Sequence, residues 1–328
     1  MEVRLREKCE LLAANKEVFE KNFKLEGAYI HLMCSSLFTA KGKMADADRV
    51  KECVEIIKKN TGILSDFRGY VKMALASMMA MEADAEVFLH QVMEVYDLLK
   101  VNHKFAAEYV VIAAASICNM HGYTRKEEIV AKTEEIYRNM KNDHPFLTSS
   151  EDCAYAAMLA AADVDIQTVE EEMERCYKLL EGDFFSKNAV QSLSHVLALS
   201  TEDSAKKCDK VKAIFTGLRD QKKKFGVGME LSVLGGVALV EESAENLTAL
   251  IAKADELLGE QKGFAGFFGI PKNQRLMCAA LLVLSNYMPE MENVNTAAVN
   301  SVVALLIAQQ IALCAAVFVS AVAASANS

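Results

Sequence analysis

A pattern that recurs at intervals of about 40 residues constrains the fold of this 328-residue chain more than any other feature. Each copy begins with an apolar residue, includes at least one polar residue and ends with an apolar residue four positions after the first. The copies are Val95–Leu99, Ile136–Met140, Cys176–Leu180, Ile214–Leu218 and Ala254–Leu258, with a fainter one beginning at Ile56. Such even spacing is typical of repeat proteins, in which each unit packs mainly on its neighbours.

Every copy has two parts, an apolar alanine-rich segment and then a charged one. The apolar segments are Tyr29–Phe38, Tyr70–Met81, Tyr109–Cys118, Ala154–Ala162, Val190–Ser200, Met229–Val240 and Leu276–Met288. In the charged segments apolar residues step by three and four positions, which is the period of an amphipathic helix. No stretch alternates as a strand does. The sequence therefore predicts an all-α fold, an α-solenoid-like stack of about six to seven helical hairpins.

Composition excludes several classes of protein. Hydrophobic residues make up 52% of the chain, which argues against disorder, and three prolines argue against a loop-rich β fold. The net charge of −9 argues against a basic nucleic-acid binder. Nine cysteines, none in a CxxC pair, indicate buried thiols in a reducing compartment. No apolar stretch follows the charged N-terminal segment, so we expect no signal peptide and a cytoplasmic protein.

The C-terminal residues differ from the rest, and we expect a boundary between a helical-repeat domain, 1–292, and an uncharged apolar helix, 293–328. Within the latter, Val302–Ala324 is long enough to span a bilayer. Alanines spaced by four suit close packing between helices instead; they are Ala304, Ala308, Ala312 and Ala316. A docked or oligomer-forming helix and a membrane tail are the two alternatives.

Four stretches carry a resemblance to a known family. They are Lys59–Gly69, Phe225–Ser232, Phe267–Met277 and the uncharged tail, rich in alanine and glutamine. Together they resemble the uncharacterised bacterial "domain of unknown function 4003" family, from about Phe19 to the end of the chain. The resemblance implies a soluble bacterial protein of this length. It implies no activity, ligand or catalytic residue.

Two loops hold candidate anion-binding residues. In the first, Arg68 follows Lys59 and Asn60, and its guanidinium suits either a carboxylate or phosphate ligand or the free carbonyls at a helix end. In the second, Gly226 and Gly228 precede a predicted helix, where backbone amides bind anions. The alternative for these glycines is a turn between repeats.

The longest irregular stretch contains Phe264, Phe267 and Phe268 among glycines, and Arg275 follows it at the start of a predicted helix. Phenylalanines in such a loop either pack back on the helices or contact a partner. Arg275 suits an ion pair with a glutamate or a bound ligand.

Two charge runs of opposite sign follow one another, acidic over 163–183 and basic over 205–224. The basic run suits an acidic partner or a nucleic acid. A ladder of ion pairs between neighbouring repeats is the alternative that we favour. A shift by one repeat aligns Glu170 with Lys210, Glu172 with Lys212, and Asp183 with Lys223.

The sequence shows no complete catalytic or metal-binding motif. His31 and Cys34 share a predicted helix face, but a zinc site needs three or four ligands. We therefore expect no cofactor or metal, no nucleic acid, and a protein-interaction or scaffold module with a protein partner. The alternatives are an enzyme or small-molecule and anion-binding protein with a pocket near Arg68 and Arg275, and a tail-anchored membrane protein using Val302–Ala324. A homo-oligomer is a further alternative.

Overall fold

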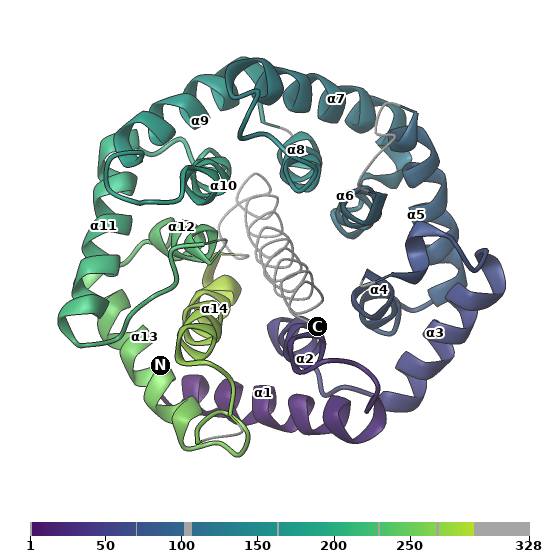
Figure 1. The fold of residues 1–328 in the computed structure, drawn as a ribbon, viewed down its shortest axis with the longest axis horizontal. Helices are drawn as coiled ribbons and strands as arrows, with labels where there is room; N and C mark the ends of the chain where they lie inside the picture. Colours follow the sequence, from purple (N-terminus) through teal and green to yellow (C-terminus); the bar gives the residue numbers. More distant parts are fainter. Residues whose placement is uncertain are drawn as a thin grey trace. The chain divides into compact units, whose positions relative to one another are not determined.

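The computed structural model describes residues 2–69, 71–101, 107–162, 164–228, 230–266 and 269–291. Within these residues all regular structure is helical, with fourteen α-helices, two short 3₁₀ helices and no β-strand (Figure 1). The predicted all-α class is thus confirmed. None of the described helices is both long and apolar enough to cross a membrane. The predicted C-terminal segment, 293–328 with Val302–Ala324, lies outside the described residues.

The described chain divides into two compact units. The first, called the 15–166 unit, contains the second part of α1 (Glu2–Asn22) and seven further α-helices. They are α2 (Ala28–Ala40), α3 (Ala47–Asn60), α4 (Val71–Met79), α5 (Ala85–Lys100), α6 (Ala107–Asn119), α7 (Lys126–Asp143) and α8 (Asp152–Ala161), with the 3₁₀ helices Asp66–Arg68 and Gly122–Arg125.

The second, called the 167–291 unit, also includes the first part of α1, up to Ala14. Its helices are α9 (Ile166–Leu180), α10 (Lys187–Leu197), α11 (Ser204–Asp220), α12 (Leu231–Ala238), α13 (Ala244–Gly259) and α14 (Lys272–Met291). Lys8 of α1 ties this unit together, because its Nζ donates to the Ser285 carbonyl and to the Ser285 hydroxyl at 3.0 Å.

The predicted apolar segments all form helices that are buried on nearly every face. Ten consecutive residues of α2, Ile30 to Thr39, are buried, and so is all of α12. Their many small residues let neighbouring helices approach closely. The charged helices bury only one stripe, as α3 does with Val50, Cys53, Val54 and Ile57. This difference follows from the composition of the two segment types.

Inside each unit, helices of the same type pack on one another. In the 15–166 unit, α4 packs between α2 and α6, and α6 packs between α4 and α8. Along one side of them α5 packs between α3 and α7 (Figure 1). In the 167–291 unit, α12 packs between α10 and α14, and α11 packs on α13.

Asp and Ser caps start most of the charged helices. The side chains of Asp46, Asp84, Asp203 and Ser243 accept hydrogen bonds from backbone amides at the starts of α3, α5, α11 and α13. The start of α8 is held in a different way. Here Asp152 Oδ2 accepts from the Ser149 amide at 2.8 Å. Burial raises the pKa of Asp152 to about 8.

The connections between helices are of two kinds. Leading connections run into an apolar helix from the charged helix before it, and trailing connections run out of an apolar helix. In the 15–166 unit the described residues of the leading connections are 23–27, 61–69, 101 and 144–151, and those of the trailing ones are 41–46, 80–84, 120–125, 162 and 164–165. Because each hairpin reverses the chain, leading connections gather at one end of the helices.

Specific contacts support this arrangement. Lys72, at the start of α4, lies 3.3 Å from Glu26 of the first leading connection. Asp66 of the second lies 2.9 Å from Lys100, the last residue of α5. At the other end, Lys43 Nζ donates to the Met81 carbonyl at 3.1 Å, which joins two trailing connections.

Candidate functional site

Arg68 closes the end of α3. Its Nε donates to Thr61 Oγ1 at 3.0 Å, and its Nη2 donates to the carbonyls of Thr61, at 2.6 Å, and Lys58. Asn60 donates to a carbonyl of its own helix at 2.9 Å. These contacts favour the helix-end alternative for Arg68, because carbonyls of the last turn lack helical partners. Lys59 is exposed, and within the described residues its ammonium has no ion-pair partner.

Gly226 and Gly228 lie against a carboxylate of the chain itself. A Cβ on Gly226 would stand 2.5 Å from Glu230 Cδ, and one on Gly228 would stand 2.9 Å from Glu230 Oε2. Asn273 Nδ2 donates to the same carboxylate at 3.3 Å. Negative charge already fills the space beside both glycines, which favours the turn alternative over an anion site.

Arg275 belongs to a partly buried ion cluster. Its Nε lies 2.7 Å from Asp255 Oδ1, and Lys223 Nζ lies 2.8 Å from Asp255 Oδ2. The pKa of the Asp255 carboxyl is lowered overall. Burial alone would raise this pKa, because it disfavours the charged form, but the hydrogen bonds from Arg275 and Lys223 outweigh that effect. The cluster joins the end of α11 to α13 and α14. The ion-pair alternative for Arg275 thus holds, with an aspartate in place of the expected glutamate.

Phe264 packs back on the helices. Its side chain is 0% exposed, and its carbonyl accepts from Arg275 Nη1 at 3.3 Å. Glycines on either side make the turn, since Gly263 and Gly266 have φ of +83° and +86°. The predicted contact residues Phe267 and Phe268 lie outside the described residues.

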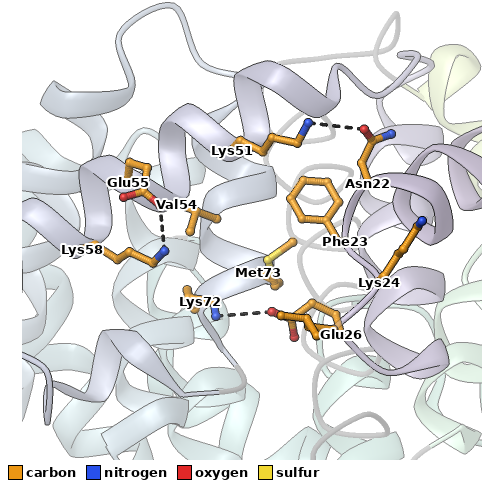
Figure 2. A pocket seen from close by; sticks show the side chains of 11 residues that line it. Asn22, Phe23, Lys24, Glu26, Lys51, Val54, Glu55, Lys58, Lys72 and Met73 are labelled. Carbon is orange, nitrogen blue, oxygen red and sulfur yellow. Dashed lines mark hydrogen bonds and ion pairs between the residues drawn. The ribbon is translucent and has the colours of Figure 1, made fainter.

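Figure 2 shows a surface pocket of about 300 Å³ in the 15–166 unit, which the sequence did not indicate. The first leading connection, α3 and the start of α4 form it. Its apolar floor contains Phe23, Val54 and Met73, and four lysines surround that floor: Lys24, Lys51, Lys58 and Lys72.

Three of these lysines have acidic partners. Lys51 lies 3.0 Å from Asp48, Lys58 lies 2.7 Å from Glu55, and Lys72 lies 3.3 Å from Glu26. Lys24 is exposed, and in the part of the chain that the structure describes it has no such partner. With four lysines against two glutamates, the lining favours a ligand that combines an anionic group with an apolar part.

A fully buried lysine lies in the basic run of α11. Lys207 is 0% exposed, and its Nζ lies 2.8 Å from Glu172 Oε1 of α9. It also donates to the carbonyls of Leu197 and Ser200, at 2.8 and 2.7 Å. The pKa of the Glu172 carboxyl is lowered overall. Burial alone would raise this pKa, but the hydrogen bonds from Lys207 and Ser204 outweigh the effect of burial.

The predicted ladder of ion pairs thus exists with different partners. Glu172 pairs with Lys207 rather than Lys212, and Lys212 lies 3.5 Å from Asp183, which was expected to pair with Lys223. Lys210 donates to the Val240 carbonyl. The predicted pairs assumed that residues 40 positions apart, one full repeat, lie opposite each other on neighbouring helices. The observed pairs are closer in sequence, so α11 is staggered along α9.

Large apolar side chains are exposed on the leading connections. Leu25, Leu64 and Phe146 are 102%, 98% and 99% exposed, and Ile63 and Val101 are also largely exposed. On the described trailing connections of the same unit, Met44 is the only such side chain, at 53%. The 167–291 unit repeats the pattern, because Phe185 is 100% exposed on the connection into α10.

Among the described residues no group of three or more His, Cys, Asp or Glu side chains is placed to hold a metal ion. His31 Nε2 is 2.9 Å from the Phe23 carbonyl. Cys34 Sγ donates to the Met73 carbonyl, and burial raises the pKa of the Cys34 thiol to about 12. Both residues thus have structural partners.

Together, the fold and these surfaces define an all-α protein of apolar and charged helices with candidate surfaces for anionic and apolar groups. A family model described as "Protein of unknown function (DUF4003)" matches residues 15–311, and the chain belongs to this family, which confirms the predicted resemblance. A similar relative is "Uncharacterized protein YeaA" of Bacillus subtilis (strain 168). It is 24% identical over 306 residues, which cover 92% of this chain and 90% of the relative. No solved structure matches the chain.

Proposed function

We propose that this protein is a helical-repeat interaction module whose hairpins stack as an α-solenoid and whose leading connections dock on a partner. The order of packing within each unit supports the repeat, because apolar helices contact the next apolar helix along the chain. The boundary near residue 292 and a cytoplasmic location belong to the same proposal.

The exposed apolar side chains of the leading connections carry this proposal. Such side chains contribute nothing to the folded core, and several in one region are typical of an interaction site. Phe184 and Phe185 illustrate the contrast within one connection. Phe184 is buried against Phe215, with ring centroids 5.1 Å apart, whereas Phe185 is fully exposed. A phenylalanine on this connection can therefore be buried, and the exposure of Phe185 is not a general property of the connection.

The contacts of the two arginines give no support to the enzyme alternative. Arg68 donates to carbonyls of its own helical hairpin, and Arg275 is bound by Asp255. A substrate would have to displace these partners, and the buried Asp255 carboxylate would then be left beside Lys223 alone. A docking role requires no such displacement.

Site-specific photo-crosslinking tests the docking role. A benzophenone amino acid replaces Phe146 in the full chain, and the matched control replaces Met44, an exposed apolar residue on a trailing connection. After irradiation in cells of the source bacterium, we expect protein or lipid adducts from position 146 and none from position 44. Equal labelling at both positions, or none at either, would refute the proposal. Native mass spectrometry of the gently purified chain then shows whether a second polypeptide is bound.

A further inference from the structure

We propose that the leading connections of the 15–166 unit dock on the surface of a bilayer that contains anionic phospholipid. This inference rests on the proposed function, because it names what the leading connections contact. It does not depend on residues 302–324.

The apolar side chains come from separate connections at one end of the unit. Leu25 stands on the first connection, Ile63 and Leu64 on the second, Val101 on the third and Phe146 on the fourth. The contacts of Glu26 with Lys72 and of Asp66 with Lys100 hold neighbouring connections together. A surface that receives several separate apolar side chains at once must be broad and must offer apolar material to each of them. The interfacial region of a bilayer has this structure.

Basic side chains accompany each of these apolar residues. Lys24 precedes Leu25 directly, Lys58 and Lys59 lie in the last turn before Ile63, Lys100 precedes Val101, and Lys141 lies five residues before Phe146. Lys58 and Lys100 are paired with Glu55 and Asp66, and Lys141 donates to the carbonyls of Pro145 and Thr148. Lys24 and Lys59 have no ion-pair partner in the described part of the chain. Lysines beside inserted apolar residues favour anionic headgroups. The chain as a whole carries −9, so the attraction of this face to an anionic surface rests on these two lysines.

The pocket of Figure 2 adds a site for one lipid at the same end. Leu25 and Lys24 belong both to its lining and to the first leading connection. A phosphate group near Lys24, with acyl carbons over Phe23 and Met73, matches the basic and apolar parts of the lining. The 167–291 unit repeats the sequence pattern, since exposed Phe185 is followed by Lys187 and exposed Val227 follows Lys222–Lys224.

Vesicle co-sedimentation of the full chain tests the inference. One set of vesicles contains phosphatidylcholine alone, and the other contains phosphatidylcholine with phosphatidylglycerol. We expect binding to the second set only, and weaker binding as salt rises from about 0.01 M to about 1 M, where the Debye length falls from about 30 Å to about 3 Å. Combined Leu25→Ser, Ile63→Ser, Leu64→Ser and Phe146→Ser replacement is expected to lower the affinity at least tenfold.

The matched control carries Met44→Ser and Val87→Ser, two half-exposed apolar residues outside the leading connections. We expect it to bind as the unchanged chain does. All six replaced side chains are exposed, so unfolding is not expected, and circular dichroism checks it. Binding that survives the four replacements would place the contact elsewhere, residues 302–324 included, and overturn the inference. So would equal binding to both vesicle sets or to neither.

The crosslinking experiment distinguishes failure of the membrane inference from failure of the proposed interaction module. If vesicles do not bind but position 146 crosslinks to a protein, the membrane inference is wrong and the interaction module stands. If position 146 gives no adduct and vesicles do not bind, both are wrong.

Discussion

Replacement of Lys207 by methionine tests how the 167–291 unit is stabilised. Methionine keeps much of the apolar stem of this fully buried side chain and removes its ammonium. That ammonium lies 2.8 Å from Glu172 Oε1 and donates to two carbonyls, that of Leu197, the last residue of α10, and that of Ser200, three residues further on. The variant therefore leaves a carboxylate and two carbonyls without their cation.

The geometry sets the size of the effect. Removing one partner of a buried ion pair costs about 3–5 kcal/mol, because the other charge stays buried without compensation. The Glu172 side chain is 14% exposed, so water reaches it in part and the lower end of that range applies. We expect Lys207→Met to lower the free energy of unfolding by about 3 kcal/mol. Lys206→Met, at the exposed neighbouring position, should change it by less than about 0.5 kcal/mol.

Denaturant titration followed by circular dichroism measures both variants, and its pH dependence identifies the cause. The pKa of Glu172 is lowered in the folded protein. A carboxyl group with a lowered pKa stabilises the fold above its unfolded pKa, and this stabilisation is lost as the pH falls through the folded pKa. The difference between Lys207→Met and the unchanged chain should therefore shrink below about pH 4.

Two results would refute this reasoning. One is a loss below about 1 kcal/mol for Lys207→Met, which would mean that the ion pair is as weak as a surface pair. The other is a loss that does not change with pH. A second replacement, Glu172→Gln, in the Lys207→Met background should restore part of the stability, because it removes the uncompensated charge.

Three further predictions concern single side chains. Arg68→Ala should lower the unfolding free energy by about 1–2 kcal/mol, measured by denaturant titration, because the end of α3 loses its donors. Between about pH 4 and pH 8 the unchanged chain should lose stability as pH rises, since folded Asp152 keeps a proton that the unfolded chain releases; Asp152→Asn should flatten this slope in melts at several pH values. Phe264→Ala should cost about 3–5 kcal/mol and Phe146→Ala less than about 0.5 kcal/mol, in the same titration.

The positions of the helices could be predicted because periodicity and composition determine them locally. The segment Tyr29–Phe38 became α2, Ala28–Ala40, and Leu276–Met288 became α14, Lys272–Met291. The start of α8 could not be predicted as well. Ser149 and Asp152 are both good capping residues, and their order in sequence does not show which one accepts the hydrogen bond.

The buried cation could have been found from the sequence. Lys207 stands four, seven and eleven positions before Val211, Ile214 and Leu218, which places it on the buried stripe of α11. Its position in a basic run favours an exposed location instead, because runs of like charge usually face solvent. Its partner was not predictable, because the stagger between α9 and α11 depends on packing along their whole length.

The candidate docking surface was not predictable for a different reason. A phenylalanine between helices can turn inward or outward, and its neighbours in sequence do not decide which. Phe264 turns inward because Gly263 and Gly266 fold the chain back and Arg275 binds its carbonyl. Phe146, between the end of α7 and the start of α8, has 99% of its surface exposed.

The separation between core and connections gives the docking proposal its physical logic. The apolar helices bury nearly every face, so stability resides in the helices and in the inward-facing side chains of the connections, such as Phe264. The exposed side chains of the leading connections can vary without loss. Exposed leucine and phenylalanine side chains add a risk of aggregation and add nothing to folding. Their concentration on one set of connections, near Lys24 and Lys59, which lack ion-pair partners among the described residues, is explained if that end of the unit is covered by an anionic surface while the protein works.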